Sequence, residues 1–354
     1  IWANPKELLE QRDHLTLLAS KLGLPVDSLL QRVTQFSDRE FVYLKRQMSP
    51  HSAEAVLALD MPGVYAQREF RRFYPAGEVV AHVLGFTNID DNGQEGAELA
   101  FNNWLQGKPG KKRVMQDRKG QRIADVAELK TGELKSAVLE LNASSGSLVM
   151  IDVPTGEILA MVNQPSYNPN AHIRDSGSNL RNRAVTDVYE PGSVMKTFTI
   201  AAALESGQFT PTMPIDTSPG RMQLANYNIG DTHNYGLTDV SGVLMHSSNV
   251  GAAKIALQLS SEQMSDALRR FGFAQVSGSG FPGESPGYLP DASRWRETEK
   301  ATIGYGYGLS VTPLQIAAAY AAIGNHGRMR APSFVKGSNN PDAAVIDPSV
   351  AADL

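Results

Sequence analysis

Residues 189–198, which read YEPGSVMKTF, are the stretch from which the rest of the chain is best interpreted. Within it a hydroxyl, Ser193, precedes an amine, Lys196, by three positions, at the predicted start of a helix. Residues at i and i+3 lie on one face of a helix, so the two side chains come within hydrogen-bonding reach. The spacing therefore predicts a serine nucleophile with a lysine beside it.

The chemistry of this pair depends on what surrounds the lysine. A serine hydroxyl is a weak nucleophile near pH 7 and needs an adjacent base. Lysine is such a base only when its pKa falls, which requires burial or a neighbouring positive field. The apolar residues from Phe198 to Leu204 predict a buried helix, and its N-terminus adds partial positive charge. The bare pattern also fits an N-cap serine followed by a surface lysine, so further motifs must decide.

Two further features favour the catalytic interpretation. Pro191 and Gly192 predict a tight turn just before the serine, as a nucleophile presented at a bend requires. Ser247-Ser248-Asn249, 54 positions after Ser193, fits an S-x-N element. A second serine and an amide suit proton transfer to a leaving group and binding of a substrate amide. S-x-x-K together with S-D-N and K-T-G is the signature of class A β-lactamases and penicillin-binding proteins.

Composition limits the other classes of function. The chain has 354 residues, 42% of them hydrophobic, enough for two domains. A net charge of −4 and no basic, aromatic-interleaved patch predict no nucleic-acid partner. No stretch of 18 apolar residues predicts a transmembrane helix. There are no cysteines, and the histidines show no H-E-x-x-H spacing, so we expect no metal and no cofactor.

The pattern of caps and turns predicts mixed secondary structure. The segment 148–162 reads as a hairpin around the turn Pro154-Thr155-Gly156, and buried helices follow it, which indicates an α+β or α/β domain. Residues 107–122 read as an exposed hairpin or linker. The glycine-rich residues 304–308 fit either a flexible binding loop or a tightly packed loop. Helices are expected after the capping residues Asn4, Ser49, Ser260 and Thr312, and the first of them is expected to continue through Leu18 and stop near Gly23.

Several ordered motifs together resemble class B penicillin-binding proteins, and within them the division-specific type of Gram-negative bacteria. They are residues 190–196, 247–251 and 305–315, with supporting segments at 72–75, 81–87, 95–98, 181–183 and 281–284. The resemblance implies a multidomain α+β protein. Residues 123–354 would form a penicillin-binding/serine β-lactamase-like transpeptidase domain with a sheet and a helical cluster. Residues 1–122 would form a smaller mixed α/β module, non-catalytic and of the pedestal or dimerisation type.

The resemblance also implies a function. It is that of a DD-transpeptidase on the periplasmic face of the bacterial inner membrane, anchored by an N-terminal helix absent from this chain. Such an enzyme cross-links peptidoglycan stem peptides ending in D-Ala-D-Ala at the septum, and β-lactams inhibit it. Expected partners are divisome membrane proteins, including a glycosyltransferase. By motif, Ser193 would be the nucleophile, Lys196 the base and Ser247 the proton relay. Asn249 would bind the substrate amide.

One departure from the family pattern concerns its third motif, K-[ST]-G. No such motif follows residues 310–324, and Lys130-Thr131-Gly132 lies upstream of the nucleophile, so it cannot be equated with the third motif. We therefore expect a transpeptidase domain that is incomplete at its C-terminal end. Either segments are omitted from the sequence, which we favour, or the chain is truncated and inactive. Omission predicts a spatial break near residues 130–133 and an active site open on the side of the missing strand.

Two other classes of function stay open. A DD-carboxypeptidase or a serine β-lactamase shares S-x-x-K, and rapid turnover of nitrocefin would indicate the latter. The non-enzymatic alternative is a catalytically inactive division scaffold, which the missing third motif favours. Labelling by a fluorescent penicillin separates an enzyme from a scaffold.

Overall fold

The computed structural model describes the whole chain except residues 68, 107–122, 171–178, 339 and 341. It divides into two compact units, Ile1–Phe73 and Tyr74–Leu354. The predicted linker at 107–122 lies outside the described residues, and the predicted domain boundary at 122 stays a prediction. No helix of the described part is both long and apolar enough to cross a membrane.

The first unit is a small mixed module around a three-stranded antiparallel sheet in the order β2-β1-β3. Its core is mainly leucine and valine from the helices and strands, including the fully buried Leu8, Leu18 and Leu22. The elements are β1 (Trp2–Ala3), α1 (Pro5–Leu9), a 3-10 turn (Arg12–His14), α2 (Leu15–Leu22), α3 (Val26–Gln35), β2 (Val42–Tyr43), α4 (Pro50–Leu57) and β3 (Val64–Tyr65).

The helix expected after Asn4 begins as predicted but is shorter than predicted. The side chain of Asn4 accepts from the backbone N–H of Lys6 at 3.2 Å, and α1 then ends at Leu9. The polar residues 10–13 offer no apolar side chain to hold a middle turn against the core. A 3-10 turn therefore intervenes. Helix α2 begins at Leu15 and ends at Leu22, and Gly23 after it has the left-handed conformation of a helix C-cap.

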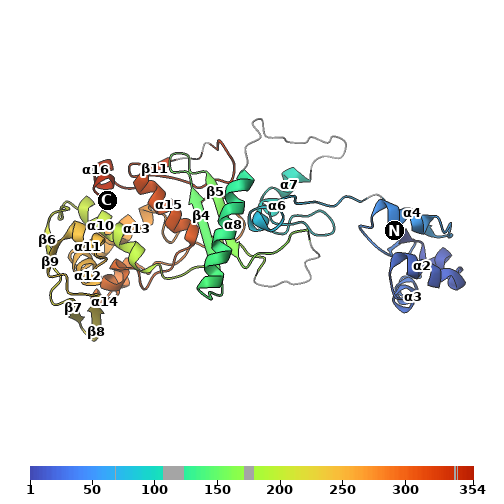
Figure 1. The fold of residues 1–354 in the computed structure, drawn as a ribbon, viewed down its shortest axis with the longest axis horizontal. Coiled ribbons are helices and arrows are strands. Elements are labelled where there is room, and N and C mark those ends of the chain that lie inside the picture. Colours follow the sequence, from blue (N-terminus) through green and yellow to red (C-terminus); the bar gives the residue numbers. More distant parts are fainter. Residues whose placement is uncertain (68, 107–122, 171–178, 339, 341) are drawn as a thin grey trace. The chain divides into compact units, whose positions relative to one another are not determined.

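The second unit combines a helical cluster with short antiparallel pairs of strands (Figure 1). Its first part contains a 3-10 turn (Gly77–Val79), α5 (Ala81–Leu84), α6 (Gly96–Ala100), α7 (Asn102–Leu105), α8 (Ile123–Glu140), β4 (Gly146–Ile151), β5 (Ile158–Gln164) and α9 (Arg183–Thr186). Then come the 3-10 turn η3 (Gly192–Met195), α10 (Lys196–Glu205), β6 (Pro214–Asp216), β7 (Arg221–Leu224), β8 (Tyr227–Gly230), β9 (Leu237–Asp239), α11 (Val240–Met245), α12 (Asn249–Gln258) and α13 (Ser261–Arg270). The last elements are a 3-10 turn (Ala292–Arg294), α14 (Glu297–Gly304), α15 (Pro313–Gly324), β10 (Arg328–Arg330), β11 (Asp342–Ala344) and α16 (Pro348–Asp353).

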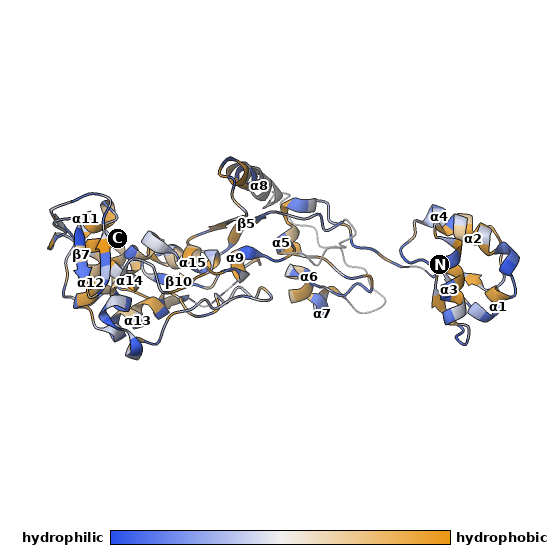
Figure 2. Cartoon of the chain, turned by 90° about the horizontal axis from the view of Figure 1, so that it is seen from below, coloured by the Kyte–Doolittle hydropathy of each residue, from blue (hydrophilic) through white to orange (hydrophobic). Residues whose placement is uncertain are grey.

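The predicted hairpin is present as β4 and β5, which pair antiparallel from Gly146–Gln164 to Ile151–Ile158. Helix α8 packs against β5 on one side, and α15 packs against β4 on the other (Figures 1 and 2). Leu134 and Val138, one helical turn apart on α8, lie closest to the space above Gly146. The hairpin is thus held between two helices rather than exposed on both faces.

The prediction of a chain break near residues 130–133 is wrong. Helix α8 runs without interruption from Ile123 to Glu140, so Lys130-Thr131-Gly132 is helical and not a strand. The apolar face formed by Leu134 and Val138 packs on the hairpin, and this tertiary contact outweighs the roughly 1 kcal/mol that a glycine inside a helix costs. The side chain of Lys130 lies outside the described ones.

Helix α10 is the centre of the helical cluster. Seven consecutive residues from Phe198 to Leu204 are buried, as predicted, so this part of the helix is buried on all sides. The ring of Phe198 packs edge-on against Phe271, Phe273 and Tyr320 at centroid distances of 4.8–5.0 Å. The cluster therefore surrounds the helix that carries the predicted base.

The predicted helix starts in the second unit are confirmed. Capping boxes at Ser260 and Thr312 open α13 and α15, with each cap side chain accepting from the third backbone N–H of its helix. Ser248 caps α12 through the backbone N–H of Gly251. These are local signals, and local hydrogen bonds satisfy them.

Candidate active site

Ser193 lies in the turn η3, one turn before α10 begins at Lys196. Its side chain is exposed, while Lys196 is 1% exposed and is the largest of the fully buried side chains. Lys196 Nζ lies 3.0 Å from Ser193 Oγ. The hydroxyl is therefore open to a substrate from outside while the amine contacts it from the core.

Ser247 approaches the same amine from the segment between α11 and α12. Lys196 Nζ lies 2.9 Å from Ser247 Oγ and donates to the Ser247 carbonyl at 2.5 Å. Ser247 has a φ of +54°, a left-handed conformation that is uncommon for residues with a side chain. This turn directs both its hydroxyl and its carbonyl to Lys196.

The three contacts restrict how Lys196 can use its proton. A carbonyl only accepts, so one N–H of the amine always points to the Ser247 carbonyl. The neutral amine then has one more N–H and one lone pair for two hydroxyls, so one hydroxyl accepts and the other donates. When Ser247 Oγ accepts, the lone pair faces the O–H of Ser193. This is the arrangement that a general base requires.

The electrostatic environment favours a neutral amine. Burial lowers the pKa of Lys196 to about 8, against an opposing effect of the Asp231 carboxylate. With that pKa, roughly one molecule in ten carries a neutral amine at pH 7, compared with fewer than about one in a thousand for a solvated lysine. The burial predicted from the downstream apolar sequence is thus what lowers the pKa.

Asn249, the third residue of S-x-N, begins α12. Its Nδ2 donates to the carbonyl of Gly230 at the end of β8, at 3.0 Å. This bond fixes the direction of the Asn249 amide, two positions after Ser247. Binding of a substrate amide by Asn249 stays a prediction.

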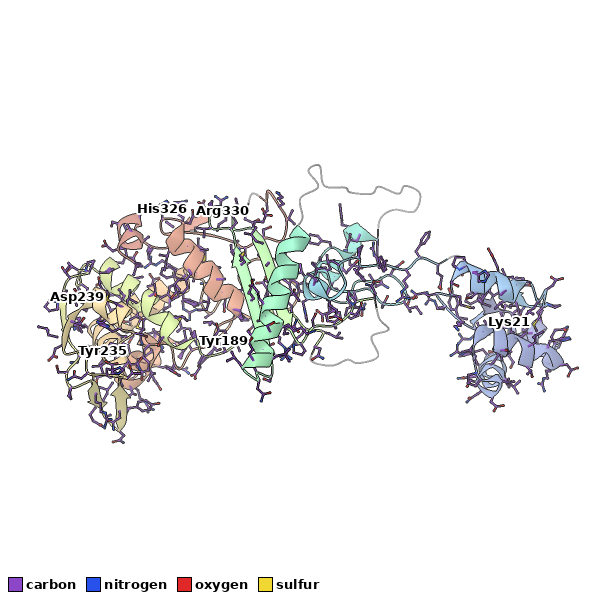
Figure 3. The ribbon with its side chains drawn as sticks, in the orientation of Figure 1. Lys21, Tyr189, Tyr235, Asp239, His326 and Arg330 are labelled. Atoms are coloured by element: carbon purple, nitrogen blue, oxygen red, sulfur yellow. The ribbon has the colours of Figure 1, made fainter. Side chains whose placement is uncertain are left out.

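The turn that carries Ser193 is held by the glycine-rich segment that follows α14. Tyr189, labelled in Figure 3, exchanges two backbone hydrogen bonds with Val311, each of 3.0 Å. In the residues that follow, the Glu190 carboxylate accepts from Gly308 N at 2.8 Å, and Gly192 N donates to Gly306 O at 2.9 Å. Of the two interpretations of residues 304–308, these contacts favour the tightly packed loop.

Gly306 is the tightest point of this contact. It has a φ of +95°, and a Cβ there would lie 1.9 Å from the Gly192 oxygen and 2.6 Å from its Cα. Because both atoms belong to the backbone, any side chain at 306 must displace the turn that carries Ser193.

We expect Gly306→Ala to slow acylation of Ser193 by a penicillin about tenfold or more, because small misplacements of a reacting group cost large factors in rate. The matched control is Gly207→Ala, which has a similar φ of +70° but nothing within 4 Å of its Cβ position. The control should lose some thermal stability and keep the rate. Equal acylation rates in both variants would show that the contact with Gly192 does not position Ser193.

Sequence reasoning missed one acidic residue of the site. Asp231, just after β8, accepts from Ser248 Oγ, Asn249 N and Val250 N at 2.5–3.0 Å. No motif marks it, because its partners lie 17–19 positions away in the sequence. His246, which precedes Ser247 in the sequence, stacks on Tyr235 with ring centroids 4.7 Å apart.

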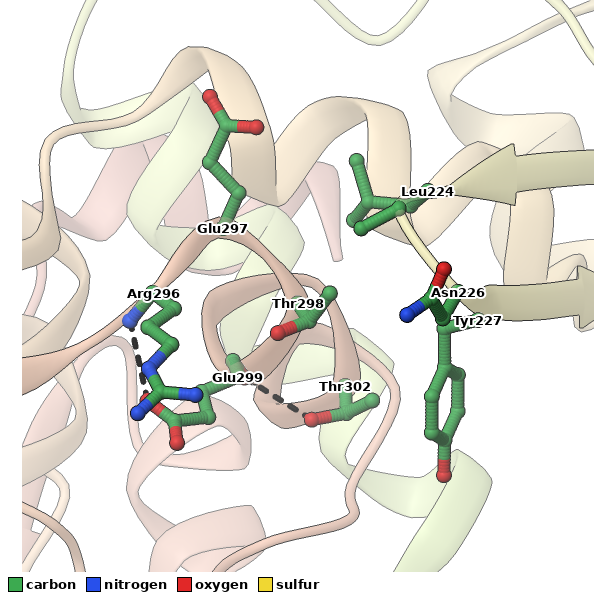
Figure 4. A pocket seen from close by; sticks show the side chains of 9 residues that line it. Leu224, Asn226, Tyr227, Arg296, Glu297, Thr298, Glu299 and Thr302 are labelled. Atoms are coloured by element: carbon green, nitrogen blue, oxygen red, sulfur yellow. Dashed lines mark hydrogen bonds between the residues drawn. The ribbon is translucent and has the colours of Figure 1, made fainter.

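A pocket of about 640 Å³ lies elsewhere in the second unit, between the β7–β8 hairpin and the start of α14 (Figure 4). Its lining includes Tyr227, Arg296 and Glu299, but neither Ser193 nor Lys196. The chemistry therefore points to the exposed Ser193 hydroxyl, not to this cavity. Within the described residues, no group of three or more His, Asp or Glu side chains is arranged to hold a metal ion.

Two serine hydroxyls, of Ser193 and Ser247, contact one buried lysine amine. This arrangement, on a domain that combines a small sheet with a helical cluster, defines the S-x-x-K class of serine acyl-transfer proteins. Comparison with known families agrees with this class. The penicillin-binding protein transpeptidase domain matches residues 146–354, and the penicillin-binding protein dimerisation domain matches residues 3–134. The chain belongs to the penicillin-binding protein transpeptidase family. The resemblance and the α+β fold class predicted from sequence are thereby confirmed.

Similar proteins include the peptidoglycan D,D-transpeptidase FtsI of Escherichia coli K12, which is 40% identical over 95% of this chain and 61% of its own length. The probable peptidoglycan D,D-transpeptidase PbpC of Pseudomonas aeruginosa is 37% identical over 99% of this chain and 66% of its own. This chain thus spans about three fifths to two thirds of these relatives.

Solved structures give the same fold. Penicillin-binding protein 3 of Mycobacterium tuberculosis in its apo form has a TM-score of 0.71 and 30% identity, covering 80% of this chain and 67% of that one. Its complex with aztreonam has a TM-score of 0.70, again at 30% identity, covering 79% of this chain and 66% of that one.

Proposed function

We propose that this chain carries the catalytic serine of a peptidoglycan D,D-transpeptidase that cross-links stem peptides and is acylated by β-lactams. The observation that carries the proposal is the position of Lys196 Nζ, within 3.0 Å of both Ser193 Oγ and Ser247 Oγ. Similarity to the E. coli D,D-transpeptidase over 95% of this chain supports it. So does the similarity to a penicillin-binding protein 3 that was solved with aztreonam.

In the first half-reaction, Ser193 Oγ attacks the carbonyl of the penultimate D-Ala of a donor peptide while Lys196 takes the hydroxyl proton. The Ser193 backbone N–H supplies half of an oxyanion hole for the developing negative charge. Breaking the C–N bond releases D-alanine, whose nitrogen receives a proton through Ser247. Asn249 holds the donor's amide while this occurs.

In the second half-reaction, an amine from a neighbouring stem peptide attacks the acyl-enzyme carbonyl. The amine loses its proton and Ser193 Oγ regains one, so the enzyme is unchanged and a new amide joins the strands. A β-lactam enters the first step in place of the donor. Its ring-opened product stays attached to Ser193.

The wider setting is proposed with the activity. The catalytic unit would act in the periplasm on septal peptidoglycan, held at the inner membrane by a helix outside this chain. It would work beside divisome membrane proteins, including a glycosyltransferase. The similarity to FtsI is the support for this setting.

The proposal is tested by incubating the protein, expressed from its whole gene, with a β-lactam and locating the adduct by mass spectrometry. The added mass should lie on the peptide that contains Ser193. An adduct on Ser247, or no adduct, would contradict the assignment. With a pentapeptide donor and an amine acceptor, the amide product indicates transpeptidation, whereas simple hydrolysis indicates the carboxypeptidase alternative.

The pH dependence of acylation follows from the pKa of Lys196, which burial lowers to about 8. Only the neutral amine accepts a proton, and its fraction rises as pH rises toward the pKa. We therefore expect the acylation rate constant to increase about tenfold per pH unit below pH 8 and to level off above it. Stopped-flow or quenched mass spectrometry with a penicillin, from about pH 5.5 to 9, measures this profile. A flat profile would mean that another group takes the proton.

A further inference from the structure

Asp231 occupies the first position after β8, where the chain leaves the β7–β8 hairpin. Its Oδ2 accepts from Ser248 Oγ at 2.6 Å, and its Oδ1 accepts from Asn249 N at 2.5 Å and Val250 N at 3.0 Å. Its own backbone N–H donates to Gly220 O, which joins it to the start of β7. One carboxylate thus connects the hairpin to the segment that contains Ser247.

Asp231 and Ser248 together satisfy the first backbone donors of α12. The first two N–H groups of the helix, of Asn249 and Val250, point to Asp231, and the third, of Gly251, points to Ser248 Oγ at 2.8 Å. Helix N-termini leave these groups without partners inside the helix, and a negative charge there is favourable. Ser248 is completely buried, so its hydroxyl hydrogen depends on the carboxylate.

The residue held next to this junction is Ser247. Its left-handed φ of +54° places it between the end of α11 and the start of α12. On the α11 side, its backbone N–H donates to Leu244 O and the next one, of Ser248, donates to Val243 O. On the α12 side, Asp231 holds the residues that follow Ser247 by accepting from the backbone N–H groups of Asn249 and Val250. An unfavourable backbone conformation persists only where the surrounding contacts determine it. Asp231 provides these contacts on the α12 side of Ser247.

Asp231 also brings a negative charge toward the buried amine. Its carboxylate opposes the effect of burial on the pKa of Lys196. The two side chains that hydrogen-bond to the amine bring no charge to it. Ser193 and Ser247 are neutral hydroxyls, and Lys254 of α12 donates instead to the carbonyl of Asp216.

We propose that Asp231 is a positioning residue, which holds Ser247 in its place against Lys196, fixes Asn249 at the start of α12, and supplies a negative charge that acts on the amine. The inference rests on the proposed acyl-transfer function. Asp231 does not touch a substrate in this role. It acts through the direction of the Ser247 hydroxyl and carbonyl and through the protonation of Lys196.

The test compares Asp231→Asn with wild type in the gene-encoded protein, using the pH profile of acylation by a penicillin. The amide keeps the shape but removes the charge and one acceptor. Loss of the carboxylate takes away the interaction that raises the pKa of Lys196. The rising limb of the profile, where the acylation rate increases with pH, should therefore move to lower pH by on the order of half a unit or more. The plateau rate should fall about tenfold or more because Ser247 is held less firmly.

Two variants complete the design. Asp239→Asn removes a comparable capping carboxylate, which accepts from Gly242 N at 2.7 Å at the start of α11. The Asp239→Asn variant should keep the wild-type pH range over which the acylation rate rises. Asp231→Glu keeps the charge and should retain the wild-type limb even if the plateau falls. An Asp231→Asn profile that is lowered at every pH without a shift would overturn the electrostatic part, and an unchanged profile would overturn the whole inference.

A second readout separates this inference from the proposed function. The pH at which Lys196 becomes reactive toward acetic anhydride, followed by mass spectrometry of its peptide, reports the ionisation of the amine without any acylation of Ser193. A wild-type protein that no penicillin labels would refute the proposed function. An earlier onset of Lys196 acetylation in Asp231→Asn would still support the charge effect, and an identical onset would refute it.

Discussion

Ser193→Ala is expected to abolish covalent labelling of the gene-encoded protein by a fluorescent penicillin. In the proposed mechanism the acyl bond forms to Ser193 Oγ, and the remaining hydroxyl near the amine, Ser247 Oγ, is hydrogen-bonded to Lys196 from the segment before α12. Alanine removes only one exposed oxygen, so the fold should be retained. Gel fluorescence measures the labelling, and thermal unfolding confirms that the variant is folded.

The matched control for this variant is Ser241→Ala. Ser241 is an exposed serine of the same unit, whose hydroxyl donates to Pro211 O at 3.2 Å. Its alanine variant should be labelled like wild type. Undiminished labelling of Ser193→Ala would transfer the nucleophile role to another residue, with Ser247 the first to examine.

Lys196→Arg is expected to have the second largest effect. A guanidinium stays protonated at every accessible pH and cannot accept the Ser193 proton. Loss of general-base help reduces rates by on the order of 10²–10⁴. The second-order rate constant for acylation by a penicillin measures this directly, and the normal rise toward pH 8 should disappear with it.

The size of arginine calls for two further variants, because Lys196 is 1% exposed and its surroundings are packed. Lys196→Gln is shorter and neutral, and it should be equally slow. Lys254→Arg changes a lysine on the neighbouring helix α12, which donates to Asp216 O, and should acylate like wild type. A Lys196→Arg protein that folds and acylates at the wild-type rate would show that the proton leaves by another route.

The local parts of the structure were predictable because they depend on neighbours in sequence. A capping serine or threonine and a glutamine three residues later define the starts of α13 and α15, and hydrogen bonds within four residues satisfy them. The contact between Ser193 and Lys196 is also local, since one helical turn brings the two side chains to one face. The position of Ser247 relative to them came from the family resemblance rather than from its own sequence.

Two predictions failed, one made from local sequence pattern and one made from the departure from the family pattern. The leucines after Asn4 suggested one helix, but the polar residues 10–13 have no partner in the core, and the chain forms two helices instead. The expected omission of segments predicted a break near residues 130–133, but α8 passes through them without interruption, and its Leu134 and Val138 pack on the hairpin. Both outcomes depend on atoms far away in the sequence.

By itself the sequence determined the spacing that brings Ser193 and Lys196 together, the apolar helix that buries Lys196, and the family to which the chain belongs. The first two depend on residue types at short, fixed spacings, and the family depends on several motifs in a fixed order along the chain. Only the tertiary structure decided that Asp231 joins the start of α12 and that Gly306 packs on Gly192. It also decided that Ser247 turns its hydroxyl and carbonyl to Lys196. The physical reason is that these contacts link residues 17 to 114 positions apart, and only packing of the intervening chain brings them together.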